Sequence, residues 1–147
     1  MAGRVRADCV FCDIASTSAP ASIVCEDADA VAFLDLRQFH PGHVLVIPRS
    51  HVPDVRDLDT ATGTAVMGML SRVTRAVGRA FPNEGLSIWS SIGEAAFQEV
   101  PHLHFHVHPR LRGDGVLKVY PRPPALPGRQ VLADYAGHIR VHLADQA

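Results

Sequence analysis

The sequence predicts an α+β domain, in which helices pack on a mostly antiparallel sheet of five strands. Three observations lead to this class. Histidine and apolar residues alternate along 101–110, as in a strand with one buried face. Apolar residues recur at helical spacing within 61–81. Short connections join the apolar segments that precede this helix, which favours antiparallel pairing.

The five strands follow from short apolar runs bounded by turn residues. A turn at DADA separates the first two, and the Pro-Gly pair in RQFHPGH precedes the third, which Pro48 ends. A loop, IGEAAFQEVP, leads into the histidine-rich strand. The expected strands are 22–27, 30–35, 43–48, 86–91 and 101–110.

Two helices are expected. Asp59 or Thr60 can cap a long helix over 61–81, whose core-facing stripe holds Val66, Leu70, Val73 and Val77. A segment with four prolines, KVYPRPPALPGR, is expected to be irregular. An amphipathic helix is expected to follow it, over residues 130–146.

Composition limits the class of protein. A chain of 147 residues fits a single domain, 1–147, with a core over about 9–143. The net charge of -1 argues against bulk binding to nucleic acid or to an anionic membrane, and no apolar run is long enough for a membrane span. Three cysteines are an odd number, which argues against a disulfide framework. We expect a cytoplasmic protein with no nucleic-acid or membrane partner.

The alternating segment 101–110 is the strongest functional signal. Its histidines share one strand face and are rooted roughly 6–7 Å apart, close enough for neighbours to hold one substrate or metal. An expression tag would lie at a terminus and lack the interleaved apolar residues, and a merely solvated face would more often carry Thr, Lys, Glu or Arg. We therefore interpret the row as a functional site. Its members are His102, His104, His106 and His108.

A zinc site can be assembled from Cys9 and Cys12, the pair in CVFC, with His51 and His102 as the two further ligands. This set would tie the N-terminal segment to the sheet. A lone CxxC motif is ambiguous, and a redox pair or two buried, reduced thiols are the alternatives.

The second chemical hypothesis is a reactive imidazole. His104 lies between two other histidines of the row, and histidine serves as a base, a nucleophile or a metal ligand. In the preceding loop Gly93 permits close backbone approach and Gln98 offers an amide, so the loop can wrap an anion. Alternatively, three neutral imidazoles of the row would hold a catalytic metal with an open position.

The motif HLHFHVH resembles the histidine triad of the HIT family of nucleotide hydrolases and transferases. CVFCDIA, AVAFLDL, PGHVLVIPRSHV, the Gln-x-Val before the triad and PRLRGDG occur in the family's order. The chain is most similar to the bacterial, zinc-containing, Hint-like branch. The resemblance implies a HIT-like fold, usually a homodimer that shares a continuous sheet.

The resemblance also implies roles for single residues. The middle histidine, His104, would attack the α-phosphorus of a purine nucleotide and form a covalent intermediate that water hydrolyses. His106 would contact the phosphate, with Gln98 near the leaving group. Asp35 would bind the ribose hydroxyls. In zinc-bearing members the first triad histidine joins the CxxC pair and a later histidine, which implies structural zinc at the four residues above and no catalytic metal. The expected nucleotide-binding set is Asp35, Leu36, Ser91, Gln98, Glu99, His104 and His106.

Three departures from the family pattern affect substrate choice. Phe97 stands where the family commonly has Gly, Ser91 where it often has Asn, and His108 where it is usually apolar. The leading hypothesis is hydrolysis or transfer with purine nucleoside phosphoramidates or nucleotidyl conjugates. A dinucleoside polyphosphate hydrolase and a nucleotide-binding protein with little turnover are the alternatives.

Overall fold

The computed structural model describes residues 6–146, which form two compact units, one ending at Val116 and one beginning at Leu117. The second unit holds an exposed irregular segment over 117–128 and the helix α3, Arg129–Ala144, close to the expected 130–146. No helix among the described residues is long and apolar enough to cross a membrane.

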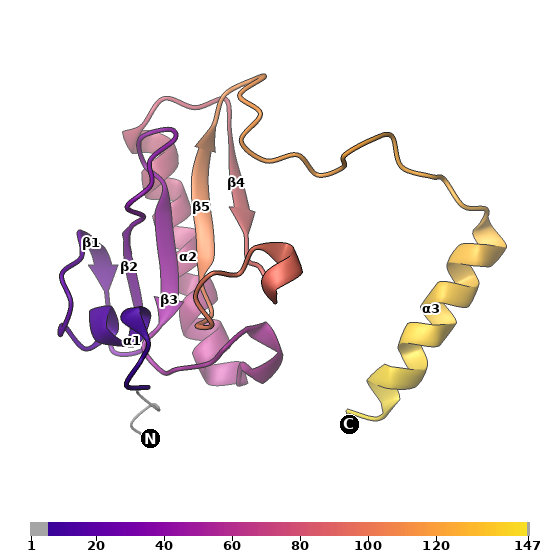
Figure 1. Ribbon diagram of the computed structural model, residues 1–147, viewed down its shortest axis with the longest axis horizontal. Helices are drawn as coiled ribbons and strands as arrows, with labels where there is room; N and C mark the ends of the chain where they lie inside the picture. The colour runs from indigo at the N-terminus through magenta and orange to yellow at the C-terminus, as the bar shows by residue number, and fades with distance from the viewer. Residues whose placement is uncertain (1–5, 147) are drawn as a thin grey trace. The chain divides into compact units, whose positions relative to one another are not determined.

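The first unit is built on the predicted sheet of five strands, in the order β1-β2-β3-β5-β4 with every neighbouring pair antiparallel (Figure 1). The α+β class is therefore confirmed. Strands β1 and β4 form the two edges, and a homodimer that shares the sheet stays a prediction. The strands are β1 Ile23–Glu26, β2 Ala30–Leu34, β3 Val44–Pro48, β4 Gly85–Trp89 and β5 Phe105–Arg110.

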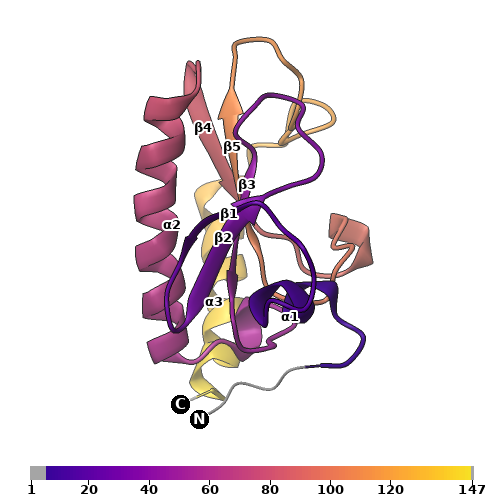
Figure 2. The ribbon, with the colours of Figure 1, turned by 90° about the vertical axis from the view of Figure 1, so that its left-hand side faces the viewer.

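Helix α2, Thr60–Ala80, covers one face of the sheet (Figure 2). Asp59 caps it, because its carboxylate accepts the backbone N–H of Thr62 at 2.9 Å. Burying each large apolar side chain of the stripe contributes roughly 1.5–3 kcal/mol. The stripe packs on Ala30, Ala32, Val44, Val46 and Val107 of the sheet and consists, as predicted, of Val66, Leu70, Val73 and Val77, with Met69 added.

The opposite face of the sheet carries a short helix that the sequence patterns did not predict. This helix, α1, spans Val10–Ala15, and the Sγ atom of its N-cap Cys9 accepts the backbone N–H of Cys12 at 3.4 Å. Six residues are too few for a recognisable helical period. Its buried side chains pack against four sheet residues, Val31, Phe33, Leu45 and Ile47.

The histidine-rich strand is shorter than predicted, since β5 begins at Phe105 and not at 101. The backbone N–H of Leu103 donates to the carbonyl of Val52 at 2.7 Å, outside the sheet ladder. The predicted alternation still holds in β5, because Phe105 and Val107 pack with the α2 cluster and the histidines take the other face. His104 therefore lies just before the strand.

Gly42 shapes the turn between β2 and β3. Its φ of +104° is a conformation that side chains rarely adopt, and a Cβ there would lie 2.5 Å from Cδ2 of Phe81. Gly42→Ala should therefore lower the free energy of unfolding by about 1–3 kcal/mol, measured by urea denaturation. Gly68 lies inside α2 with nothing within 4 Å of a built Cβ, so Gly68→Ala should be neutral or stabilising. Equal stability of both variants would contradict this account of the turn.

Candidate active site and metal centre

The histidines of the row are buried. His102 is fully enclosed, His104 and His108 are 7% and 2% exposed, and His106 is partly buried. Phe11 of α1 lies edge-on to both His102 and His104, with ring centroids 6.0 and 5.1 Å apart. A solvated polar strand face is therefore excluded for this row.

Backbone carbonyl groups determine where three of these rings carry their proton. Nε2 of His102 lies 2.9 Å from the carbonyl oxygen of Pro48, and Nδ1 of His104 lies 2.7 Å from that of His102. Nδ1 of His108 lies 2.7 Å from the carbonyl oxygen of Pro109. A carbonyl oxygen only accepts, so each of these ring nitrogens must donate. It follows that neutral His104 has its free lone pair on Nε2.

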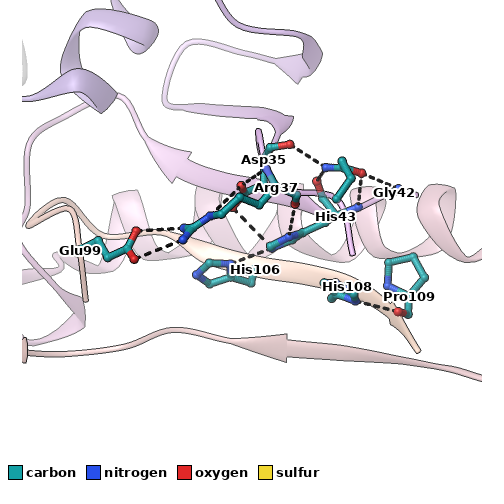
Figure 3. A network of polar contacts seen from close by, with 9 residues as sticks. Asp35, Arg37, Gly42, His43, Glu99, His106, His108 and Pro109 are labelled. Carbon is teal, nitrogen blue, oxygen red and sulfur yellow. Dashed lines mark hydrogen bonds and ion pairs between the residues drawn. The ribbon is translucent and has the colours of Figure 1, made fainter. Parts of the chain in front are cut away.

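His43 extends this arrangement, although the sequence reasoning did not single it out. Its Nδ1 donates to the carbonyl of Arg37 at 3.1 Å, which leaves Nε2 as an acceptor. That atom lies 2.9 Å from Nδ1 of His106, so His106 donates to it and keeps a lone pair on its own Nε2 (Figure 3). Trp89, also not foreseen, stacks on the His106 ring with centroids 4.4 Å apart and planes 5° apart.

Burial keeps this pair neutral. It is the main reason why the pKa of His106 falls from 6.5 to about 3, with the charges of neighbouring histidines as further causes. The pKa of His43 is also lowered, again mainly by burial. Both rings are therefore uncharged at neutral pH, which agrees with the proton positions that the carbonyl groups impose.

Asp35 lies next to the His43–His106 pair at the end of β2. Its Oδ1 accepts the backbone N–H of Arg37 at 2.8 Å, and its Oδ2 lies 3.8 Å from Nε2 of His43. This carboxylate is nearly buried and keeps lone pairs for a further donor. Leu36, from the same expected nucleotide-binding set, is fully exposed.

The loop before the row is closed by Gln98. Its Oε1 accepts the backbone N–H of Gly93 at 2.9 Å, and its Nε2 donates to the carbonyl of Pro53 at 2.8 Å. Phe97 stands on this loop, 89% exposed, with a φ of +63° that favours glycine. Ser91 is partly buried, and its neighbour Ser90 donates to the carbonyl of His104 at 2.8 Å. The roles expected for Gln98 and Ser91 stay predictions.

The four residues expected to hold zinc come together. Cys9, Cys12, His51 and His102 each offer a ligand atom, all within 4.8 Å of one another. The Sγ of Cys12 lies 3.3 Å from Nδ1 of His51 and 3.5 Å from Nδ1 of His102, and the Sγ of Cys9 lies 3.4 Å from the latter. Zinc bonds of ordinary length at a tetrahedral angle place sulfur and nitrogen about 3.5 Å apart. The spacing therefore fits a zinc ion.

The surroundings of the four residues also fit a metal. Because Nε2 of His102 donates to Pro48, its Nδ1 presents a lone pair to the cysteines, the arrangement typical of metal-binding histidines. Burial raises the pKa of the Cys12 thiol, so binding a cation would release a proton. The chemistry supports a closed structural site.

A second group of possible ligand atoms belongs to Asp35, His43 and His106. Two features oppose a cation there. The two imidazoles already share a hydrogen bond, and Nε of Arg37 lies 3.7 Å from Oδ1 of Asp35. The catalytic-metal alternative therefore gains no support from this group.

Comparisons with known proteins show the family to which the chain belongs. The sequence model of the family described as HIT domain matches residues 16–113 of this chain. The protein hit of Bacillus subtilis is 36% identical over 109 residues, 74% of this chain and 75% of that protein. The adenosine 5'-monophosphoramidase hnt1 of Schizosaccharomyces pombe is 32% identical over 102 residues, 69% of this chain and 74% of that protein. The crystal structure of SMU.412c from Streptococcus mutans UA159 superposes with a TM-score of 0.87 at 32% identity, covering 97% and 89% of the two chains.

The lowered pKa of His106 predicts that stability falls in acid. Between pH 6.5 and about 3, His106 is protonated in the unfolded chain but not in the folded protein. The free energy of unfolding is therefore unaffected by this histidine above pH 6.5 and decreases as the pH falls below that value. The slope is about 1.4 kcal/mol per pH unit for each such histidine. Urea denaturation of metal-free protein at pH 7 and pH 5 should show this loss.

His106→Asn should reduce that pH dependence, because it removes one titrating group. The same change at His138, an exposed histidine of α3, should leave it as in the wild type. A pH dependence that His106→Asn does not alter would contradict the assignment of a neutral, buried ring.

We expect the cluster of Cys9, Cys12, His51 and His102 to bind one zinc ion per chain. Titration with Co²⁺ should produce a thiolate-to-metal absorption band, and removal of the metal should lower Tm. Cys12→Ser should lose the band, whereas Cys25→Ser should keep it, since Cys25 lies outside the cluster. A band lost equally in both variants, or absent from the wild type, would contradict the site.

Proposed function

Because the chain belongs to the HIT domain family, we propose that it cleaves purine nucleoside phosphoramidates at the α-phosphorus through a covalent bond to His104. The observation that carries the proposal is the hydrogen bond of 2.7 Å from Nδ1 of His104 to the carbonyl of His102. It fixes the tautomer in which Nε2 is unprotonated and nucleophilic. A relative that is 32% identical carries the name adenosine 5'-monophosphoramidase, which supports this class of substrate.

The first step forms a bond between Nε2 of His104 and the α-phosphorus. The leaving amine departs with the electron pair of the phosphorus–nitrogen bond and takes up a proton. The bond from His104 to the His102 carbonyl stabilises the positive charge that develops on the imidazole, because Nδ1–H remains its donor. Splitting the displacement into two steps is the advantage of covalent catalysis.

The second step releases the nucleotide, and the enzyme regains its starting state once His106 has passed the proton that it takes up to solvent. Water attacks the phosphorus, the bond to Nε2 breaks, and the nucleoside monophosphate leaves. Nε2 of His106 has a lone pair that can take a proton from this water, while the Nδ1–H of His106 continues to donate to Nε2 of His43. Once Nε2 has taken up this proton, the ring can donate it to a phosphoryl oxygen, and the negative charge of the phosphate stabilises that protonated form.

Asp35 is proposed as the ribose ligand. Its nearly buried carboxylate is fixed by the N–H of Arg37 and retains lone pairs for two adjacent hydroxyl groups. A zinc ion at Cys9, Cys12, His51 and His102 would supply structural cross-linking only, and neither of the two reaction steps requires a metal.

Retention of nucleotide without turnover is a second candidate function. The observation that favours it is the engagement of Gln98, whose amide bonds Gly93 and Pro53 within its own loop. Such an amide is not free to contact a phosphate or a leaving group. Phe97, on the same loop, adds a bulky side chain where relatives commonly have glycine.

The covalent intermediate is testable by intact-protein mass spectrometry after brief exposure to adenosine 5'-phosphoramidate and acid quenching. The wild type should gain the mass of an AMP group, and His104→Ala should gain none, because it lacks the nucleophile. His106→Ala should still form the adduct, with slower hydrolysis, since its His104 remains.

An adduct that persists in His104→Ala would contradict the assignment of the nucleophile. Absence of an adduct together with uncleaved phosphoramidate would contradict the proposed phosphoramidase activity. Tight AMP binding measured by calorimetry in that case would identify the second candidate function.

A further inference from the structure

Arg37 makes a two-point contact with Glu99 beside the proposed nucleotide site. Its Nη1 and Nη2 donate to the two carboxylate oxygens of Glu99 at 3.2 and 3.0 Å. Figure 3 shows this pair beside His106, with Asp35 at the base of the arginine side chain. The pair joins the segment after β2 to the loop before the histidine row, 62 residues apart in the sequence.

The backbone of Arg37 is part of the site. Its N–H donates to Oδ1 of Asp35 at 2.8 Å, and its carbonyl accepts from Nδ1 of His43 at 3.1 Å. The side chain therefore starts from a fixed point between the proposed ribose ligand and the partner of His106. A group that binds this guanidinium would lie against the bound nucleotide.

Stability does not account for the ion pair. Both side chains are mostly exposed, at 71% for Arg37 and 66% for Glu99. Exposed pairs of this kind contribute little to stability, because water screens the charges and two long side chains must be ordered. The planar fork of an arginine matches carboxylate and phosphate oxygens equally well.

We propose that Arg37 binds a second phosphate group of the substrate, beyond the one that His104 attacks, and that this phosphate displaces Glu99. The inference rests on the proposed function of the same site. Glu99 fills the guanidinium fork in this structure, and a phosphate brings the same oxygen geometry with greater charge. The second phosphate has two possible positions, the leaving group beyond the α-phosphate or the ribose near Asp35.

This assignment separates substrates that the triad residues alone do not. Adenosine phosphoramidate with a simple amine leaving group has nothing for Arg37 to bind. Nucleotidyl conjugates with a phosphate in the leaving group, dinucleoside polyphosphates among them, or with a phosphate on the ribose do. We therefore expect the preferred substrates to carry this additional phosphate.

Calorimetric binding of three nucleotides to the full chain tests the inference without requiring turnover. AMP lacks a second phosphate, ADP places one beyond the α-phosphate, and adenosine 3',5'-bisphosphate places one on the ribose. In the wild type, ADP or the bisphosphate should bind at least tenfold more tightly than AMP. Arg37→Gln should reduce that preference to less than threefold, because the fork is lost.

Two further variants sharpen the test. Glu99→Gln removes the competing carboxylate, so the preference for the second phosphate should rise severalfold. Arg72→Gln makes the same change of charge on α2, where Arg72 contacts Asp27 at 3.5 Å, and should keep the wild-type preference. If Arg37→Gln and Arg72→Gln both lose the preference for a second phosphate over AMP, the preference depends on net charge alone. This result would overturn the inference.

Comparison of the three nucleotides also identifies the position of the second phosphate and separates the role of Arg37 from the proposed catalysis by His104. A preference for ADP alone places the second phosphate in the leaving group, and one for the bisphosphate alone places it on the ribose. Equal affinities for all three nucleotides in the wild type would overturn the role of Arg37, even if the His104 adduct forms. An Arg37-dependent preference without an adduct would support the phosphate site and reject the proposed catalysis.

Discussion

The chemistry of this site depends on hydrogen bonds from buried imidazoles to backbone carbonyl groups. His104 donates through Nδ1 to the carbonyl of His102, and His43 donates through Nδ1 to that of Arg37. An acceptor that can never donate selects one tautomer of a neutral ring. A histidine in water exchanges freely between its tautomers, whereas here the free lone pair of a neutral His104 ring is held on Nε2.

The same constraint connects the cluster of Cys9, Cys12, His51 and His102 to the ring of His104. His102 faces the two cysteines through Nδ1 and is held on its other side by Pro48, at 2.9 Å from Nε2. Its carbonyl in turn holds His104. Cys12 of α1 and its N-cap Cys9 thus reach the proposed nucleophile through one intervening residue, His102, although α1 contributes no reacting atom. A structural ion at this place would stiffen the support of the nucleophile.

Much of the sheet and of the row could be predicted, because alternation and helical spacing are local properties of the sequence. The same alternation runs from His43 through Leu45 and could have placed His43 on the face of the row. The start of β5 could not be predicted, since it depends on the bond from Leu103 to Val52.

Other features of the site depend on contacts between distant segments. The pair of Arg37 and Glu99 joins residues 62 apart, and no local pattern marks either partner. The stacking of Trp89 on His106 follows only from the register of β4 against β5, which places the two residues opposite each other. The four candidate metal ligands were assembled from residue types, but their spacing of 3.3–3.5 Å required the fold.

The most direct test of this account is the tautomer of His104 in solution. Long-range ¹H–¹⁵N correlation spectra of labelled protein at pH 7 distinguish a protonated from an unprotonated ring nitrogen, and His104→Gln identifies the resonances. The account predicts a protonated Nδ1 and an unprotonated Nε2. A His104 ring protonated at Nε2 would contradict it, because the atom proposed to attack phosphorus would then have no free lone pair.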